Sequence, residues 1–376
     1  MQRQNKNELS SCKQTKYQNS RTFIFSQQAA GNFSHEQGEL FSRSREYRES
    51  NNMNPHCGIQ QINSLAKNKT PFLFIIDYTK ENIIIEELAT ISSEEILFDV
   101  NGQSNFYTEK EASTEAPIFT KKPIDFKAFE QGFSYVLANL KQGNSYLTNY
   151  TCETPISTNL SLKDIFRKSE AKYKLLYKNL FVVFSPETFI KITDGKIFSF
   201  PMKGTIDASI PEAEKIILND LKETAEHATI TDLIRNDLSK VATNINVDRY
   251  RYIDKINTNH GELLQISSQI SGELPMGYQA NLGDIIFSLL PAGSITGAPK
   301  QKTIEIIKEA ETYKRGFYTG VFGLFDGKSV DCGVMIRFIE NKNGKLVFKS
   351  GGGITVNSKA HDEYDEMIKK VYLPFH

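Results

Sequence analysis

The order of the apolar runs along this chain constrains its fold more than any other feature. Residues 72–76 (Phe-Leu-Phe-Ile-Ile) and 82–88 (Asn-Ile-Ile-Ile-Glu-Glu-Leu) indicate two buried strands joined by a short polar turn. The other expected strands span residues 180–184, 189–192, 330–340 and 345–349, the last two joined across an Asn-Lys-Asn-Gly turn. Because strands do not alternate strictly with helices, as parallel sheets require, the sequence predicts an α+β fold with antiparallel sheet.

Helical spacing of apolar side chains predicts the remaining elements. The expected helices span residues 125–142, about 212–234, a segment that begins near Pro299, and roughly 361–372. The first of them carries its apolar side chains on a single stripe. The start of the third follows from proline, which is favoured in the first turn of a helix.

Residues 1–52 differ from the rest of the chain. They are rich in Gln, Asn, Ser, Arg and Glu and show no sustained apolar period. Such a segment buries too little apolar surface to offset the entropy lost on ordering, so we expect a disordered extension. Residues 53–376 are expected to form one domain, in which 53–120 supply N-terminal sheet elements and 121–376 form the main core.

Charge and hydropathy exclude two classes of partner. The 45 Lys and Arg residues balance the 45 Asp and Glu residues without a strongly basic segment, whereas nucleic acid demands a positive field. The longest apolar runs, such as 71–76, fall far short of the roughly 20 residues that span a bilayer. The first residues lack the apolar core of a signal peptide. We therefore expect a cytoplasmic protein with no membrane or nucleic-acid partner.

Two pairs of glutamates recur at helical spacing. Glu223 and Glu226, and again Glu363 and Glu366, lie three residues apart, so each pair shares one helix face. Lys370 follows Glu366 by four residues on the same face. Two such helices facing one cavity would suit Mg²⁺, a hard ion held by carboxylates, water and ligand oxygens. On spacing alone, solvated helix faces are the alternative.

Two glycine-containing segments have the composition of anion sites. Gly351, Gly352 and Gly353 follow an expected strand, and consecutive glycines let backbone N–H groups approach an anion. A flexible turn is the alternative. Residues 291–300 (Pro-Ala-Gly-Ser-Ile-Thr-Gly-Ala-Pro-Lys) lead into an expected helix, whose N-terminus favours anionic ligands. An ordinary capped helix start is the alternative there.

A lysine and a glutamate lie on neighbouring expected strands. Lys203 stands in Pro-Met-Lys-Gly-Thr, sixteen residues after the glutamate Glu187 of Ser-Pro-Glu. If the fold brings them together, they can act as a nucleophile and a general acid. Lysine attacks only as the free amine, so burial or a nearby cation must lower its pKa. A Lys-Gly-Thr sequence in an ordinary turn is the alternative.

In this order, the motifs resemble those of the chorismate-utilising enzymes, which include anthranilate synthase component I, aminodeoxychorismate synthase component I, and the isochorismate and salicylate synthases. The resemblance covers about residues 60–376. It is carried by residues 185–189, 201–205, 222–228, 232–238, 291–300, 315–320, 336–337, 351–353 and 363–366. It implies layered antiparallel sheets flanked by helices, as in anthranilate synthase component I, and a single chorismate-binding catalytic domain at 53–376.

The resemblance also implies roles for the matching residues. Glu226 and Glu366 are expected to bind Mg²⁺, which would bind the ring carboxylate of chorismate, with Glu223 and Glu363 in support. Arg337 is expected to hold the enolpyruvyl carboxylate, because its planar fork pairs with a carboxylate through two bonds. The other expected substrate contacts are Tyr318, Gly352 and Gly353 at that carboxylate, Thr296 and Gly297 near the ring, and Lys370 at the metal end.

Lys203 distinguishes members of the family. Aminodeoxychorismate synthases usually carry Pro-Ile-Lys-Gly-Thr where anthranilate synthases carry Pro-Ile-Ala-Gly-Thr, and this chain has the lysine. The resemblance thus implies amination of chorismate at C4, on the route to para-aminobenzoate and folate, with Lys203 attacking C2 and Glu187 protonating the leaving hydroxyl. Anthranilate synthase component I and a non-catalytic chorismate-binding regulatory protein are the alternatives.

Ammonia is expected from a separate glutaminase subunit or from the free pool, because no cysteine lies in the Gly-x-Cys-x-Gly elbow of a glutaminase. Two positions depart from the family pattern. Thr188 replaces an arginine that is common after Ser-Pro-Glu, and Gln265 replaces a histidine. Glutamine forms hydrogen bonds but carries no charge, so position 265 is not expected to act as an acid or base.

Overall fold

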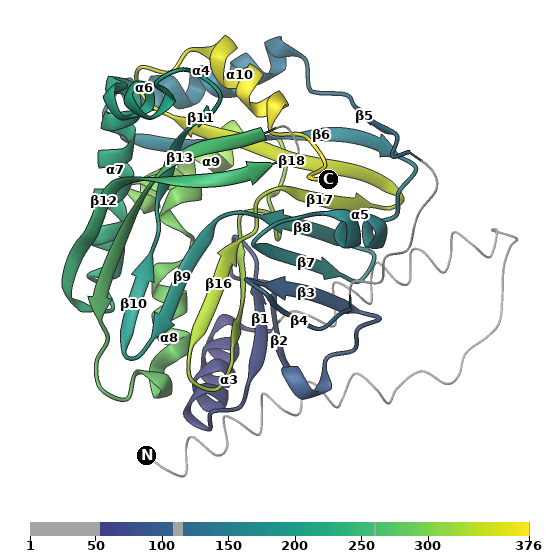
Figure 1. The fold of residues 1–376 in the computed structure, drawn as a ribbon, viewed down its shortest axis with the longest axis vertical. Helices are drawn as coiled ribbons and strands as arrows, with labels where there is room; N and C mark the ends of the chain where they lie inside the picture. Colours follow the sequence, from purple (N-terminus) through teal and green to yellow (C-terminus); the bar gives the residue numbers. More distant parts are fainter. Residues whose placement is uncertain (1–52, 108–115, 259–260, 376) are drawn as a thin grey trace, which may run out of the picture.

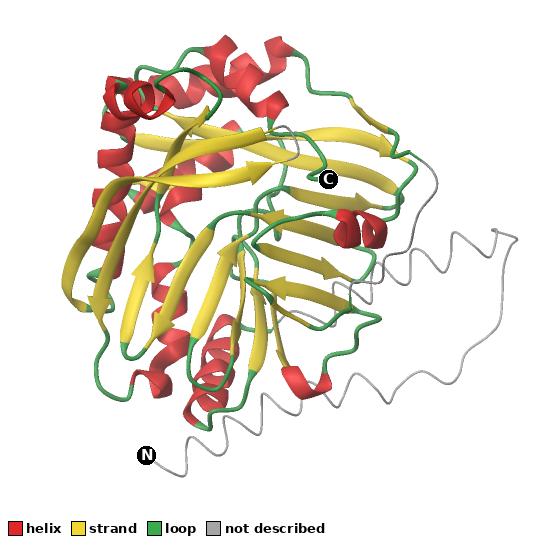
Figure 2. Cartoon of the chain, viewed as in Figure 1, coloured by secondary structure: helices red, strands yellow, loops and turns green. Residues whose placement is uncertain are grey.

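The computed structural model describes residues 53–107, 116–258 and 261–375, and the expected extension at 1–52 lies outside these ranges. The described chain forms two nine-stranded sheets that pack against each other, with helices on their outer faces (Figure 1). Every strand pair is antiparallel. Layered antiparallel sheets flanked by helices (Figure 2) confirm the predicted α+β fold.

The first sheet draws its strands from three separate parts of the chain. They are β1 (Phe72–Ile76), β2 (Ile83–Glu87), β9 (Thr188–Thr193), β10 (Lys196–Ser199), β11 (Met202–Asp207), β12 (Thr243–Thr258), β13 (Gly261–Glu273), β15 (Val321–Phe325) and β16 (Val330–Val334). Their order is β11-β13-β10-β9-β16-β15-β1-β2, with β12 paired to β13. The early strand β1 therefore lies beside the late strand β15.

The second sheet is interleaved with the first along the chain. Its strands are β3 (Ile96–Val100), β4 (Gln103–Ser104), β5 (Phe119–Lys121), β6 (Leu147–Thr158), β7 (Tyr173–Tyr177), β8 (Phe181–Ser185), β14 (Gly297–Ala298), β17 (Phe338–Lys342) and β18 (Lys345–Ile354). Their order is β14-β6-β18-β17-β8-β7-β3-β4, with β5 paired to β6. Long strands β6 and β18 lie side by side near one end of this sheet.

Helices cover the outer face of each sheet. They are α3 (Pro55–Lys67), α4 (Phe126–Lys141), α5 (Leu162–Lys168), α6 (Ala213–Asn219), α7 (Leu221–Leu238), α8 (Leu282–Leu289), α9 (Lys300–Ala310) and α10 (Ala360–Lys369), with 3-10 turns η1 (Leu88–Thr90), η2 (Tyr278–Asn281) and η3 (Gly293–Ile295). Helices α3, α7 and α8 pack on the first sheet, and α4, α9 and α10 pack on β6 and β18 of the second. None of the helices in the described ranges is long and apolar enough to cross a membrane.

Strand β1 shows how the layers are held together. Phe72, Phe74 and Ile76 pack with α3, α7 and α8 in one apolar core. Leu73 and Ile75 point to the opposite face and pack with residues of β3, β7 and β8 between the sheets. Successive side chains of a strand alternate between its faces, so this one apolar run contributes to two cores.

The expectation of a single strand at 330–340 is wrong. The structure divides it into β16 in the first sheet and β17 in the second, so the chain changes sheet at 335–337. Arg337 has a φ of 51° at this point, a left-handed conformation that permits the sharp change of direction. The apolar pattern does not reveal the break because both halves are largely buried. The hairpin of β17 with β18 is confirmed.

The helix expected at 212–234 is divided as well. Asp220 lies between α6 and α7 in an extended conformation, and its side chain accepts a hydrogen bond from the N–H of Glu223 at 2.9 Å. This bond caps α7, which then continues to Leu238. Helix α3 was not expected, although Asn54 caps it and Pro55 takes its first position, as is typical of a helix start.

We expect Asp220→Ala to lower the free energy of unfolding by about 1 kcal/mol, because the first turn of α7 loses a hydrogen-bond acceptor. Asp220→Asn is the matched control, since it keeps a side-chain oxygen that can cap the helix. Urea unfolding followed by circular dichroism measures both variants. An equal loss in the two would mean that the charge of Asp220, rather than its cap, stabilises α7.

Candidate functional site

Lys203 and Glu226 lie at the centre of the site. Lys203 on β11 faces α7, and its Nζ lies 2.6 Å from Oε2 of Glu226. The lysine side chain is 26% exposed and that of Glu226 only 8%, so the pair is accessible from the lysine side. Glu223 reaches the same strand from α7, because a β-carbon built on Gly204 would lie 3.0 Å from its Oε2. Gly204 has a φ of 78°, so a glycine suits this position.

A second carboxylate pair comes from α10. The Nζ of Lys370 lies 2.6 Å from Oε1 of Glu366 and donates to the carbonyl oxygen of Gly351 at 2.8 Å. Oε1 of Glu363 accepts a hydrogen bond from Ser358 at 2.7 Å. Glu363 is buried, as is Glu226 of the first pair, whereas the side chain of Glu366 is 54% exposed. One residue of each pair is therefore not part of a solvated helix face.

The glycine triplet lies between the two carboxylate pairs. Residues 351–353 continue β18 and pair with β6, so they form a strand and not a flexible turn. A β-carbon on Gly352 would lie 3.2 Å from Oε2 of Glu363, and one on Gly353 would lie 3.6 Å from Nζ of Lys203. The absence of side chains at these positions therefore lets the strand lie close to both pairs.

The carboxylates determine the charge of Lys203. Burial lowers the pKa of Lys203, but Glu226, Glu366 and Glu223 more than offset this effect and leave the pKa raised above 10.5. The side chain is therefore an ammonium ion in this arrangement. It cannot attack as an amine while these carboxylates surround it.

The same glutamates have the chemistry of a divalent-cation site. Carboxylate oxygens are the ligands that Mg²⁺ prefers in proteins, and here they come from two helices on either side of the glycine strand. Within the described ranges, no three His, Cys, Asp or Glu side chains are gathered as a formed metal site. Instead Lys203 and Lys370 each bind an oxygen that such an ion would need. The residues thus fit the ion by type, with lysine ammonium groups in its place.

Glu187, between β8 and β9, supplies a further carboxyl. Its Oε1 accepts a hydrogen bond from the hydroxyl of Ser294 on η3. Burial raises the pKa of Glu187, although the bond from Ser294 and the positive charges of Arg337, Lys370 and Lys203 act to lower it. A carboxyl with a raised pKa keeps its proton more readily near neutral pH, which suits a general acid.

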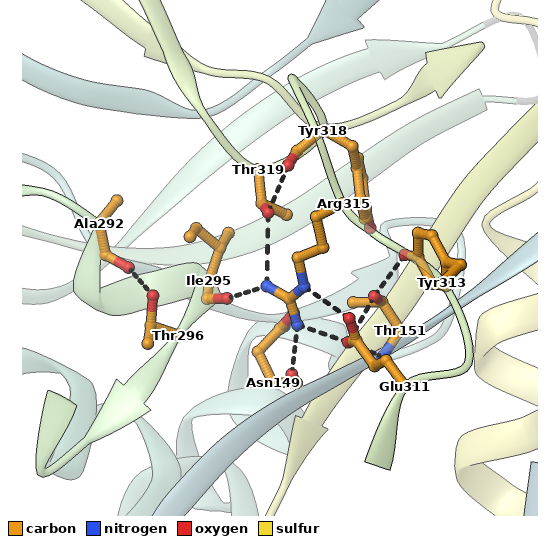
Figure 3. Close-up of polar contacts among 10 residues, drawn as sticks. All are labelled: Asn149, Thr151, Ala292, Ile295, Thr296, Glu311, Tyr313, Arg315, Tyr318 and Thr319. Carbon is orange, nitrogen blue, oxygen red and sulfur yellow. Dashed lines mark hydrogen bonds and ion pairs between the residues drawn. The ribbon is translucent and has the colours of Figure 1, made fainter. Parts of the chain in front are cut away.

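A buried ion pair lies beside β6, the strand that pairs with the glycine triplet (Figure 3). The side chains of Arg315 and Glu311 are 3% and 2% exposed, and they join through two contacts of 2.6 and 2.9 Å. Arg315 also donates to the carbonyl oxygens of Ile295 at 2.9 Å and Asn149 at 2.7 Å. Glu311 accepts from both the N–H and the hydroxyl of Thr151. One ion pair thereby connects β6 with the segments before and after α9.

Three of the expected substrate contacts are buried around this ion pair. The hydroxyl of Thr296 donates to the carbonyl oxygen of Ala292 at 2.8 Å. Gly297 has a φ of 124°, and a β-carbon there would lie 1.8 Å from the carbonyl oxygen of Leu147, so only glycine fits. Tyr318 is 4% exposed and packs in the core between the sheets. Leu147 links this group to the glycine strand, because its side chain would lie 3.1 Å from a β-carbon on Gly353.

Arg337 lies between the two groups of residues, at the point where the chain changes sheet. Its guanidinium carbon is 5.6 Å from the centre of the Tyr372 ring. Its positive charge lowers the pKa values of both Tyr318 and Glu187, although burial leaves both raised. Arg337 is thus within electrostatic reach of Tyr318 in the core between the sheets and of Glu187 between β8 and β9.

Sequence reasoning gave no role to Ser294, Glu311 or Arg315. Ser294 and Arg315 lie inside recognised motifs, but their partners become evident only from the fold. The two departures from the family pattern are close to the site. Thr188 accepts a hydrogen bond from Nζ of Lys172 at 2.9 Å. Gln265 on β13 pairs with Thr205 of β11, which lies two residues after Lys203.

Fold and site together define a class of protein. Residues 2–375 match the chorismate binding enzyme family, and the chain belongs to this family. It is 50% identical over 317 residues to an uncharacterized PabA-like protein of Haemophilus influenzae, covering 84% of this chain and 96% of that protein.

Two named enzymes are more distant. The chain is 30% identical over 286 residues to aminodeoxychorismate synthase component 1 of Bacillus subtilis, which covers 69% of this chain and 60% of that protein. The crystal structure of anthranilate synthase component I from Streptococcus pneumoniae matches with a TM-score of 0.60 and 25% identity. That match covers 69% of this chain and 60% of the other.

We expect Glu311→Ala to lower the free energy of unfolding by about 3–5 kcal/mol, because it leaves the Arg315 charge buried without its carboxylate. Glu305→Ala, on the preceding helix α9, is the control. Glu305 pairs with Lys302 at 2.8 Å in an exposed position, so its loss should cost no more than about 1 kcal/mol. Guanidinium chloride unfolding compares the two variants, and equal losses would contradict a special role for the buried pair.

Proposed function

We propose that the protein is an aminodeoxychorismate synthase component I, which converts chorismate and ammonia to 4-amino-4-deoxychorismate. The observation that carries the proposal is the position of Lys203, whose Nζ would lie 3.6 Å from a β-carbon on Gly353 and is paired with Glu226. Chorismate is a dianion, and Lys203, Lys370 and Arg337 provide positive charges close to one another. The match to the Bacillus subtilis enzyme adds support from sequence.

In the proposed reaction Lys203 first leaves Glu226 and releases a proton to the solvent, because the carboxylates hold it as an ammonium ion. It then attacks C2 of the ring as the free amine. The ring double bonds shift, and the C4 hydroxyl leaves as water with a proton from Glu187. Ammonia then adds at C4 while the bond between C2 and the lysine breaks. The sum is chorismate plus ammonia giving 4-amino-4-deoxychorismate plus water, so no oxidant or reductant is needed. The raised pKa of Glu187 supports its part as the acid.

We propose Mg²⁺ as the cofactor, bound by Glu226 and Glu366 with Glu223 and Glu363 in support. When bound, the ion would supply a positive charge for the ring carboxylate of chorismate. Because Lys203 binds an oxygen of Glu226 at 2.6 Å, its ammonium group and the ion compete for the same carboxylate. We also propose that ammonia comes from a separate glutaminase subunit.

The competition predicts an unusual effect of removing a positive charge. Lys203→Met should tighten Mg²⁺ binding, by roughly tenfold or about 1.4 kcal/mol, because the carboxylates lose a competing cation. Glu226→Gln should weaken it, since the ion loses a charged ligand. Isothermal calorimetry with MgCl₂ measures both without any turnover. Lys215→Met is the matched control, because Lys215 pairs with Glu212 on the exposed face of α6. Weaker binding in Lys203→Met would contradict the competition.

Product identification tests the reaction itself. Chorismate, MgCl₂ and ammonium chloride should give 4-amino-4-deoxychorismate, detected by mass spectrometry, whereas glutamine alone should not. Lys203→Ala and Lys203→Arg should both lose most of the rate but still bind chorismate. Alanine has no amine, and arginine keeps the charge but stays protonated, so neither can act as the nucleophile. Each tenfold loss of rate corresponds to about 1.4 kcal/mol in the barrier.

Other outcomes of this experiment identify the alternatives. Anthranilate as the product would identify an anthranilate synthase component I, the activity named for the Streptococcus pneumoniae structure. Chorismate binding without any product would identify a non-catalytic binding protein. A Lys203→Arg enzyme that makes the same product at a substantial rate would contradict covalent attack by the lysine.

A further inference from the structure

We propose that Ser294 is a positioning residue for Glu187: its hydroxyl holds one carboxyl oxygen, so that the other oxygen carries the acid proton toward the substrate. The inference rests on the proposed function, in which Glu187 is the general acid. Its basis is the contact of 2.5 Å between Oγ of Ser294 and Oε1 of Glu187, which joins the turn after β8 to η3.

The backbone around Ser294 is held on both sides. The carbonyl oxygen of Ile295 accepts a hydrogen bond from the buried guanidinium of Arg315 at 2.9 Å. On the other side, Gly293 packs on α7 so closely that a β-carbon there would lie 3.0 Å from Oδ2 of Asp237. These two anchors hold the backbone of η3, from which the hydroxyl of Ser294 reaches Glu187.

The contact distinguishes the two oxygens of the carboxyl group. A hydroxyl that donates to Oε1 occupies one of its lone pairs and stabilises Oε1 as a hydrogen-bond acceptor. The protonated acid therefore carries its proton on Oε2, while Oε1 acts as the carbonyl oxygen. A general acid must deliver its proton within hydrogen-bond reach of the leaving group, so a fixed proton position favours the reaction.

Other charges act on Glu187 but do not make this distinction. The charged groups facing it are Arg337 between β16 and β17, Lys370 after α10, Lys203 on β11, Asp237 on α7 in the same cavity, and Lys172 before β7, bonded to the adjacent Thr188. The cavity beside Glu187 is lined mainly by apolar side chains of α7, β9 and residues 200–201 after β10, so the serine hydroxyl supplies a directed contact in mostly apolar surroundings.

The first test compares Ser294→Ala with Ser294→Thr, which keeps the hydroxyl. A hydrogen bond donated to a carboxylate stabilises its charged form, so its removal raises the pKa of Glu187. Activity that requires protonated Glu187 falls as pH rises through this pKa. In Ser294→Ala the alkaline limb of the kcat profile should therefore move up, by roughly one pH unit. The same variant should lower kcat with little change in KM for chorismate, and Ser294→Thr should restore both.

Ser288→Ala is the matched control, because this hydroxyl bonds the carbonyl oxygen of Ile285 within α8 and should leave the profile unchanged. A second measurement needs no substrate. Infrared difference spectra against Glu187→Gln isolate the carboxyl band of Glu187, and its C=O stretch should move to higher wavenumber in Ser294→Ala, because Oε1 loses its donor.

The two measurements separate this inference from the proposed function. A moved band in a protein that makes no 4-amino-4-deoxychorismate would support the positioning of Glu187 and overturn the proposed reaction. A folded Ser294→Ala protein with an unmoved band and an unmoved alkaline limb would overturn the role of Ser294, even if the wild-type chain has the proposed activity.

Discussion

The ion pair between Arg315 and Glu311 is the interaction on which the site depends. Removing two charges from water costs several kcal/mol for each, and their attraction offsets this only when the remaining donors and acceptors are also bonded. Here the additional partners are backbone groups of Asn149, Thr151 and Ile295. The pair therefore requires β6 and the segments on both sides of α9 to be in their final positions. An apolar contact would tolerate small shifts there, whereas this bonded network does not.

Outside this buried network, the positive and negative side chains around the glycine strand nearly balance one another. Four glutamates from α7 and α10 surround the glycine strand, and Lys203, Lys370 and Arg337 oppose them. A dianion entering this space adds negative charge beside carboxylates, which is unfavourable without a further cation. This charge balance favours the proposed Mg²⁺, because a divalent ion would compensate for the two negative charges of chorismate. The zero net charge of the whole chain therefore does not reveal that this site needs additional positive charge to bind a dianion.

Local features of the sequence predicted much of the fold and the composition of the site. The buried run 72–76, the proline before α9 and the glutamates three residues apart all depend on neighbours in the chain. The missed features depend on distant partners. The change of sheet at 335–337 is hidden because both flanking strands are buried, and the contact of Ser294 with Glu187 joins segments that meet only in the folded protein. Asp220 shows an intermediate case, where one capping side chain divides a continuous helical pattern.

The interleaving of the strands has a consequence for synthesis on the ribosome. Phe72 of β1 pairs with Phe325 of β15, and Thr148 of β6 pairs with Ile354 of β18. Apolar strands made early therefore wait, with unpaired edges, until most of the described chain has been translated. Such edges pair readily with other chains, and distant pairings form slowly. The nascent protein thus carries an exposed edge of β1 through most of its synthesis, and its charged cluster cannot assemble before α10 leaves the exit tunnel.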